Sequence, residues 1–319
     1  RFAHTAQLNA PPFEGMFQSN SWGSSLTTAY TSISQQMDDI VFSLDVPILQ
    51  SQSNNGDQLS RPQAWAKNII SVGGIRHYNT LARTDDAWAS GASIGPAADG
   101  RLKPDISNYY DSTFTTTSTN NTAYTSSFGG TSGATPISAG ATGLMLQMWG
   151  AGLFGAVPPG NNLFAKRPAA MTTKALLINT AEQYPFAGVG VDLSRAKQGW
   201  GTADVKIAHD LGSAGKVFVV DETQLLVPLQ TATYALTVPA GTPELKATLV
   251  FRDPAGTTSA TQHRINNLDL RVTAPDATQY WGNNGLAAAN YSTSGGSPNL
   301  VDTVENVFVL NPAAGTWTI

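Results

Sequence analysis

The pattern of apolar residues changes at about residue 213 of this 319-residue chain, and this change constrains the fold most. Before it, short apolar runs at 46–49 and 69–74 stand on either side of a segment, 28–42, whose apolar residues share the spacing of one helix face. Alternation of strand, helix and strand predicts a mainly parallel sheet flanked by helices. We therefore expect an α/β domain over residues 1–213.

After residue 213 the apolar residues gather in short runs that are separated by Gly, Pro, Asn and Asp. Such spacing, over about 100 residues, predicts an all-β domain of the jelly-roll or sandwich type. This second domain would span residues 214–319. The expected strands are 217–220, 233–238, 245–252, 268–274, 304–310 and 316–319.

Composition excludes several classes of function. Charged residues make up 13% of the chain and the net charge is -4, so there is no basic footprint for nucleic acid or an anionic membrane. No apolar run approaches the roughly 20 residues of a membrane span. The absence of cysteine excludes disulfides, thiol catalysis and zinc–thiolate sites. A surface that is polar without being charged indicates an extracellular, secreted protein.

A helix of small apolar residues is expected to begin just after Ser132 and to run to about Trp149, with Pro136 in its first turn. Gly130 and Gly133 on either side of Ser132 permit close approach of another backbone. The helix N-terminus offers free N–H groups, so the Ser132 amide would suit a developing oxyanion. Taken alone, the same segment is also explained by an ordinary helix cap.

The segment 130–136, Gly-Thr-Ser-Gly-Ala-Thr-Pro, resembles the serine box of the subtilase family. Further segments resemble the same family in the same order: 20–23, 53–56, 66–73, 99–105 and 198–201. Together they cover about residues 18–213. The resemblance implies a subtilisin-like fold and an extracellular serine endopeptidase of broad specificity, which acts on polypeptides without an organic cofactor and often binds calcium.

The resemblance also implies residue roles. Ser132 would be the nucleophile that forms the acyl-enzyme, and Asn54 would donate its amide to the oxyanion. An ordinary turn asparagine is the alternative for Asn54, because Asn-Asn-Gly suits a turn and Ser53 replaces the family's usual glycine. The substrate-binding residues would be Ser21, Trp22, Gly23, Ser53 and Thr131. For Trp22 the alternative is a buried side chain that fills the core.

The C-terminal part is similar to the β-sandwich of the oxidation-resistant, high-molecular-mass alkaline subtilases, through residues 250–253, 266–270 and 304–307. Calcium prefers hard oxygen ligands, and the carboxylates of this part are its candidate ligands. They are Asp253, Asp269, Asp302 and Glu305. Solvated turn carboxylates are the alternative for each of them.

Subtilases place the catalytic Asp and His before the Ser in the chain. Residues 1–19 contain His4 and no Asp. The four histidines, which we expect to be ordinary surface or helix residues, are His4, His77, His209 and His263.

Three explanations for this gap stay open. In the first, the chain is a fragment that lacks the N-terminal portion of its catalytic domain, and a preceding segment or a separate N-terminal fragment supplies Asp and His; both chain ends look cut. In the second, the chain is an inactive homologue that binds peptides, which is favoured by Gly133, where the family has Met, and by the sequence of 107–110. The third is a rewired site that uses His4 or another base.

Overall fold

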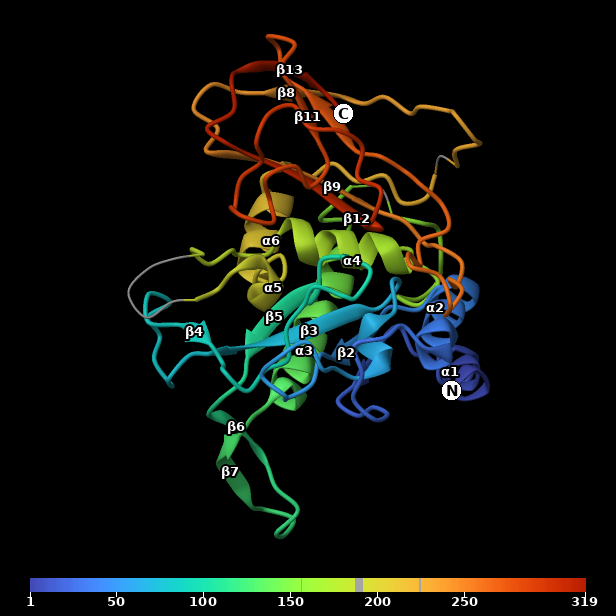
Figure 1. Ribbon diagram of the computed structural model, residues 1–319, viewed down its shortest axis with the longest axis vertical. Helices are drawn as coiled ribbons and strands as arrows, with labels where there is room; N and C mark the ends of the chain where they lie inside the picture. The colour runs from blue at the N-terminus through green and yellow to red at the C-terminus, as the bar shows by residue number, and fades with distance from the viewer. Residues whose placement is uncertain (156, 187–191, 224) are drawn as a thin grey trace.

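The computed structural model describes residues 1–155, 157–186, 192–223 and 225–319 (Figure 1). The helices are α1 (Phe2–Asn9), α2 (Ser32–Leu44), η1 (Pro62–Trp65), α3 (Thr131–Gly150), α4 (Ala170–Asn179), α5 (Arg195–Gln198) and α6 (Val205–Ser213). The strands are β1 (Gln18–Asn20), β2 (Ile48–Ser51), β3 (Ile70–Arg76), β4 (Ala87–Trp88), β5 (Ile106–Tyr109), β6 (Thr113–Thr116), β7 (Tyr124–Phe128), β8 (Ala235–Val238), β9 (Glu244–Val250), β10 (Arg271–Thr273), β11 (Gln279–Trp281), β12 (Val304–Leu310) and β13 (Gly315–Thr318).

A parallel sheet lies at the centre of the N-terminal part. β1, β2, β3 and β5 are parallel neighbours, and the short β4 runs antiparallel to β3. Ile48 and Leu49 are consecutive in β2 and therefore point to opposite faces of the sheet. Ile48 packs with α2, and Leu49 packs with α3. The two helices thus cover opposite faces, and the predicted α/β fold is confirmed for this part of the chain.

The helix expected over 28–42 begins only at Ser32, because Thr31 caps it. The first residues form α1. Residues 85–130 are mostly irregular, and they contain the short strands β4 and β5 and the β6–β7 hairpin, which projects from the body (Figure 1). The threonines of this tract favour strands because their branched side chains fit a pleated surface.

The C-terminal part consists of two antiparallel sheets. β11, β10, β13 and β8 form one sheet, and β12 pairs with β9 in the other. Side chains from both sheets, such as Val272 and Trp317 from the first and Val307 from the second, share one core. The strand expected at 304–310 is confirmed, β11 was missed, and 217–220 is not a strand. The division into two domains at residue 213 stays a prediction.

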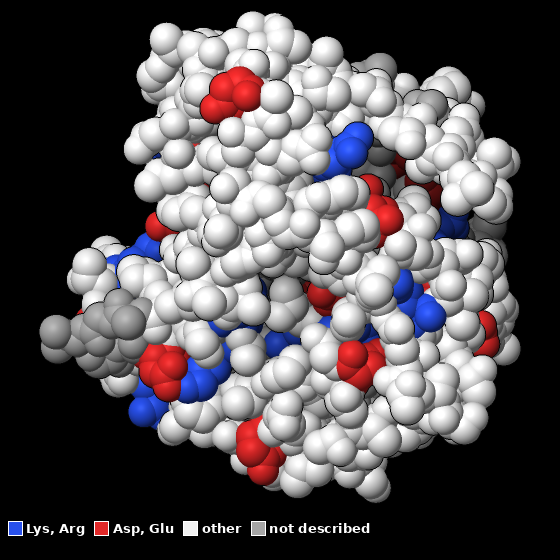
Figure 2. Space-filling model, turned by 45° about the horizontal axis from the view of Figure 1, so that its top comes forward, with Lys and Arg blue, Asp and Glu red and all other residues white. Residues whose placement is uncertain are grey.

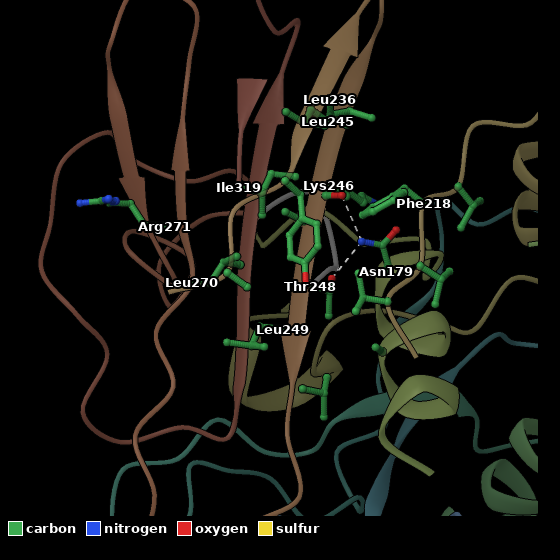
Figure 3. Close-up of a pocket in the computed structure, with 18 of the residues that line it drawn as sticks. Asn179, Phe218, Leu236, Leu245, Lys246, Thr248, Leu249, Leu270, Arg271 and Ile319 are labelled. Atoms are coloured by element: carbon green, nitrogen blue, oxygen red, sulfur yellow. Dashed lines mark hydrogen bonds between the residues drawn. The ribbon is translucent and has the colours of Figure 1, made fainter. Parts of the chain in front are cut away.

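A cavity of about 2210 Å³ lies between α4, the segment after α6 and β9 (Figure 3). Figure 3 shows Asn179 at its wall, where its Nδ2 donates to Lys246 O (3.2 Å) and Thr248 Oγ1 (2.9 Å). None of Ser21, Asn54 or Ser132 lines this cavity. It is therefore separate from the candidate site.

Charged side chains are sparse on the face shown in Figure 2, in agreement with the 13% of charged residues in the sequence. Figure 2 shows acidic and basic side chains scattered in small groups over a largely uncharged face. Among the described residues no helix is both long enough and apolar enough to cross a membrane.

A buried charge cluster supports the central sheet near β3. Lys103 Nζ lies 2.6 Å from Asp105 Oδ2, and Lys174 Nζ lies 2.8 Å from Asp105 Oδ1. Burial lowers the pKa of Lys103 to about 7. Burial opposes ionisation of Asp105, but the two lysines outweigh it and hold the pKa of Asp105 at about 2. Lys103 and Asp105 therefore form a buried structural pair.

Candidate active site

Ser132 is the second residue of α3 and is half-buried. Gly130, with φ 80°, turns the chain into the helix, and its carbonyl accepts from the N–H groups of Gly133 (2.8 Å) and Ala134 (3.2 Å). Within the described residues the N–H of Ser132 has no partner. Ser132 Oγ makes one long contact, 3.5 Å to Ser21 O. A hydroxyl and an unused N–H of the same residue therefore lie together at a helix N-terminus.

Pro136 explains why the carbonyl of Ser132 is available to Ser21. It lies in the second turn of α3, not in the first turn as expected, and stands four residues after Ser132. A proline has no N–H to donate to the carbonyl four residues before it. The Ser132 carbonyl instead accepts from Ser21 Oγ at 3.0 Å. The residue after β1 is thereby tied to the start of α3.

Asn54 reaches the same helix N-terminus from the end of β2. Its Oδ1 accepts from Thr131 N (2.8 Å) and from Thr131 Oγ1 (3.0 Å). These two bonds occupy the oxygen of the amide. Nδ2 has no partner among the described residues and is therefore available as a donor. Because Thr131 directly precedes Ser132, Asn54 contacts the residue next to the serine. The structure thus brings together Asn54, Thr131 and Ser132.

Ser53, which the sequence predicts to bind substrate, is buried and has φ 105°. Its N–H donates to Thr131 Oγ1 at 3.2 Å. A positive φ favours glycine, so the serine is strained where the family has its glycine.

Replacing Ser53 by glycine is expected to stabilise the fold. The strain that is relieved exceeds the entropy that glycine adds to the unfolded chain, and the net gain is about 1 kcal/mol. Urea unfolding at pH 7 measures it. Ser51→Gly in the neighbouring strand is the control and is expected to destabilise the fold. A loss of stability in Ser53→Gly would contradict the strain at this position.

The segment after β1, residues 21–24, has backbone groups that could pair with an extended peptide. Trp22 O accepts from Gln50 Nε2 (2.8 Å), and Ser24 uses its N–H and carbonyl with Gln63 and Arg61. The N–H and carbonyl of Gly23 have no partner in the described part of the chain. Trp22 is 50% exposed, so it is not the buried core side chain of the alternative interpretation. An extended peptide has an accessible place to pair here.

No histidine contacts Ser132 among the described residues. His4 and His209 are exposed on α1 and α6, as expected. His263 contradicts the expectation, because it is buried and stacks on Tyr30 with ring centroids 4.2 Å apart. Burial lowers its pKa.

His77 forms a pair that sequence reasoning missed. Its Nδ1 lies 2.8 Å from Asp111 Oδ1, and its ring stacks on Tyr109. Ile75 of β3 is the register partner of Tyr109 in β5, so residues two positions further along each strand lie close together. Knowledge of that strand pairing would have found the pair. The hydrogen bonds of His77 do not reach Ser132.

The four predicted calcium ligands do not form a metal site. Among the described residues no group of three or more His, Asp and Glu side chains is arranged to hold a metal ion. Asp253 and Asp302 have both carboxylate oxygens engaged by N–H groups, and Asp269 accepts from Asn267 with both of its oxygens. Glu305 Oε1 alone lacks a partner. Calcium binding therefore stays a prediction without a site.

The parallel sheet, the serine at a helix N-terminus and the nearby amide donor are features of serine hydrolases. The family model described as the subtilase family matches residues 10–201. This match covers more than half of the chain, which therefore belongs to the subtilase family and has its α/β fold. The family is one of serine peptidases.

The individual proteins that this chain resembles share low sequence identity with it. The chain is 28% identical over 273 residues to the serine protease/ABC transporter B family protein tagD of Dictyostelium discoideum, and the match covers 68% of this chain and 15% of that protein. The chain therefore spans only a small part of this curated relative. Sphericase is similar at 20% identity with a TM-score of 0.46, covering 64% of this chain and 61% of that one. The patellamide maturation protease PatA is similar at 16% identity with a TM-score of 0.48, covering 67% of each chain.

Proposed function

We propose that this chain carries the nucleophile and oxyanion-binding half of a serine endopeptidase. Ser132 Oγ attacks the carbonyl carbon of a peptide bond. The oxyanion that forms accepts hydrogen bonds from Asn54 Nδ2 and from the Ser132 N–H. The observation that carries the proposal is that both donors lack partners beside Ser132, because Thr131 holds the other end of the Asn54 amide.

A base is needed to complete the reaction. It takes the proton of Ser132 Oγ as the bond to carbon forms, and gives it to the leaving amine as the peptide bond breaks. No histidine of the described residues contacts Ser132, so we assign the base and its carboxylate partner to a segment or a separate fragment outside these 319 residues. Water then hydrolyses the acyl-enzyme.

A fluorophosphonate probe tests this proposal. The protein that includes the segment with Asp and His is expected to be labelled on Ser132, and Ser132→Ala is expected to abolish labelling. Ser127→Ala, in the neighbouring hairpin, is the matched control and should leave labelling intact. Absence of labelling in the complete native protein would overturn the peptidase proposal.

The second candidate is an inactive subtilase homologue that binds peptides. It is favoured by Gly133 directly after Ser132 and by the lack, among the described residues, of an imidazole that contacts Ser132. It predicts that peptides bind with no turnover and no labelling in the complete protein. The labelling experiment therefore separates the two candidates.

We also propose that the two C-terminal sheets form a β-sandwich, as in the oxidation-resistant subtilases, and that the protein is secreted. The shared core of the sheets supports the first proposal, and the scarcity of charged residues supports the second.

A further inference from the structure

Arg61 lies against residues 21–23, the segment expected to pair with a substrate, and has no anionic partner in the described part of the chain. A Cβ added to Gly23 would lie 2.6 Å from Arg61 Cγ and 2.8 Å from Arg61 Cδ. The aliphatic stem of the arginine therefore crosses Gly23 at van der Waals distance. Because Gly23 has no side chain, the stem of Arg61 occupies the space that a side chain at this position would fill.

The guanidinium of Arg61 makes one hydrogen bond, from Nη1 to Ser24 O (2.8 Å). No carboxylate lies within 4.0 Å of it among the described residues. Its remaining N–H groups are therefore available, and the side chain is only partly buried. Arg101, in contrast, is paired with Asp99 at 2.7 Å.

The guanidinium of Arg1 also contacts Ser24. Arg1 Nη2 donates to Ser24 Oγ at 3.3 Å, and its other contacts are Gln36 and the ring of Trp22. Neither arginine is paired with a carboxylate of the residues that the structure describes. Two positive charges thus lie beside Ser24, directly after the segment 21–23, in a protein whose net charge is negative.

We propose that Arg61 is a specificity-determining residue, which selects a substrate with an acidic side chain at the position that lies over Gly23. The inference rests on the proposed function, because it takes 21–23 as the strand that pairs with the substrate. A glutamate or aspartate there receives charge-assisted hydrogen bonds from the planar guanidinium. A lysine there is repelled.

The test measures equilibrium binding of fluorescein-labelled peptide amides, Ala-Ala-Pro-Glu, Ala-Ala-Pro-Gln and Ala-Ala-Pro-Lys, to the 319-residue chain by fluorescence polarisation. The glutamate peptide is expected to bind about tenfold more tightly than the glutamine peptide, and the lysine peptide most weakly. Higher salt is expected to reduce the preference.

Two variants assign the preference to Arg61. Arg61→Gln is expected to make the glutamate and glutamine peptides equal, and Arg61→Glu is expected to favour the lysine peptide. Arg271→Gln removes the same charge from the C-terminal sheet, where the arginine is exposed and faces Trp281, and should leave the preference unchanged.

Equal binding of the glutamate and glutamine peptides to the unaltered chain would overturn the inference. An unchanged preference in Arg61→Gln, or no binding of any of the three peptides, would overturn it as well. Fluorophosphonate labelling of Ser132 reports on the proposed function separately, since that probe carries no side chain for Arg61 to select.

Discussion

Asn54→Ala is expected to lower kcat of the assembled protease by about 100- to 1000-fold with little change in KM. In the proposed mechanism the amide donates to the oxygen of the peptide carbonyl, and that oxygen becomes charged only as the tetrahedral intermediate forms. The interaction is therefore stronger in the transition state than with bound substrate. Steady-state hydrolysis of a peptide substrate measures both constants.

Two variants separate this role from a structural one. Asn55→Ala is the matched control, because Asn55 is also exposed and its amide donates to Asp57 rather than toward Ser132. Asn54→Asp keeps an acceptor for Thr131 but loses the donor, and should be at least as inactive as Asn54→Ala. Near-normal kcat in Asn54→Asp would show that Asn54 acts only as an anchor for Thr131.

The local part of the site could be predicted from sequence. Ser132 lies in a short motif before an apolar helix, and such a segment has few alternative structures. Asn54 follows a buried strand, so its place at the sheet edge also follows from local pattern. The ordering of the Asn54 amide by Thr131 required the structure, because it depends on how β2 and α3 meet.

Contacts between distant segments were not predictable in the same way. The tie between Ser21 and Ser132 depends on Pro136 standing four residues after Ser132 inside the helix, whereas the sequence pattern placed Pro136 in the first turn. The pair of His77 and Asp111 depends on the register of β3 with β5. Registers of parallel strands are set by packing of both sheet faces, and single-sequence patterns do not determine them.

Substitution of Lys67, which contacts both the N-terminal and the C-terminal part of the chain, is expected to change stability more than substitution of Ser53. Its Nζ lies 3.0 Å from Asp38 Oδ2, 3.5 Å from Asp253 Oδ2 and 2.8 Å from Pro254 O, and all three charged side chains are fully buried. Asp38 belongs to α2, whereas Asp253 follows β9 of the C-terminal part. The ammonium therefore neutralises two carboxylates that come from distant segments.

Lys67→Met is expected to destabilise the protein by about 3–5 kcal/mol, because the methionine fills similar space but leaves both carboxylates buried without their cation. Urea unfolding at pH 7 measures the loss. Lys206→Met removes a lysine from an exposed pair with Asp210 on α6, and should change stability little. Adding Asp38→Asn to Lys67→Met is expected to recover part of the loss, since one uncompensated charge is removed. A loss in Lys67→Met no larger than in Lys206→Met would contradict the view that this ion cluster holds the C-terminal sheets against the N-terminal part.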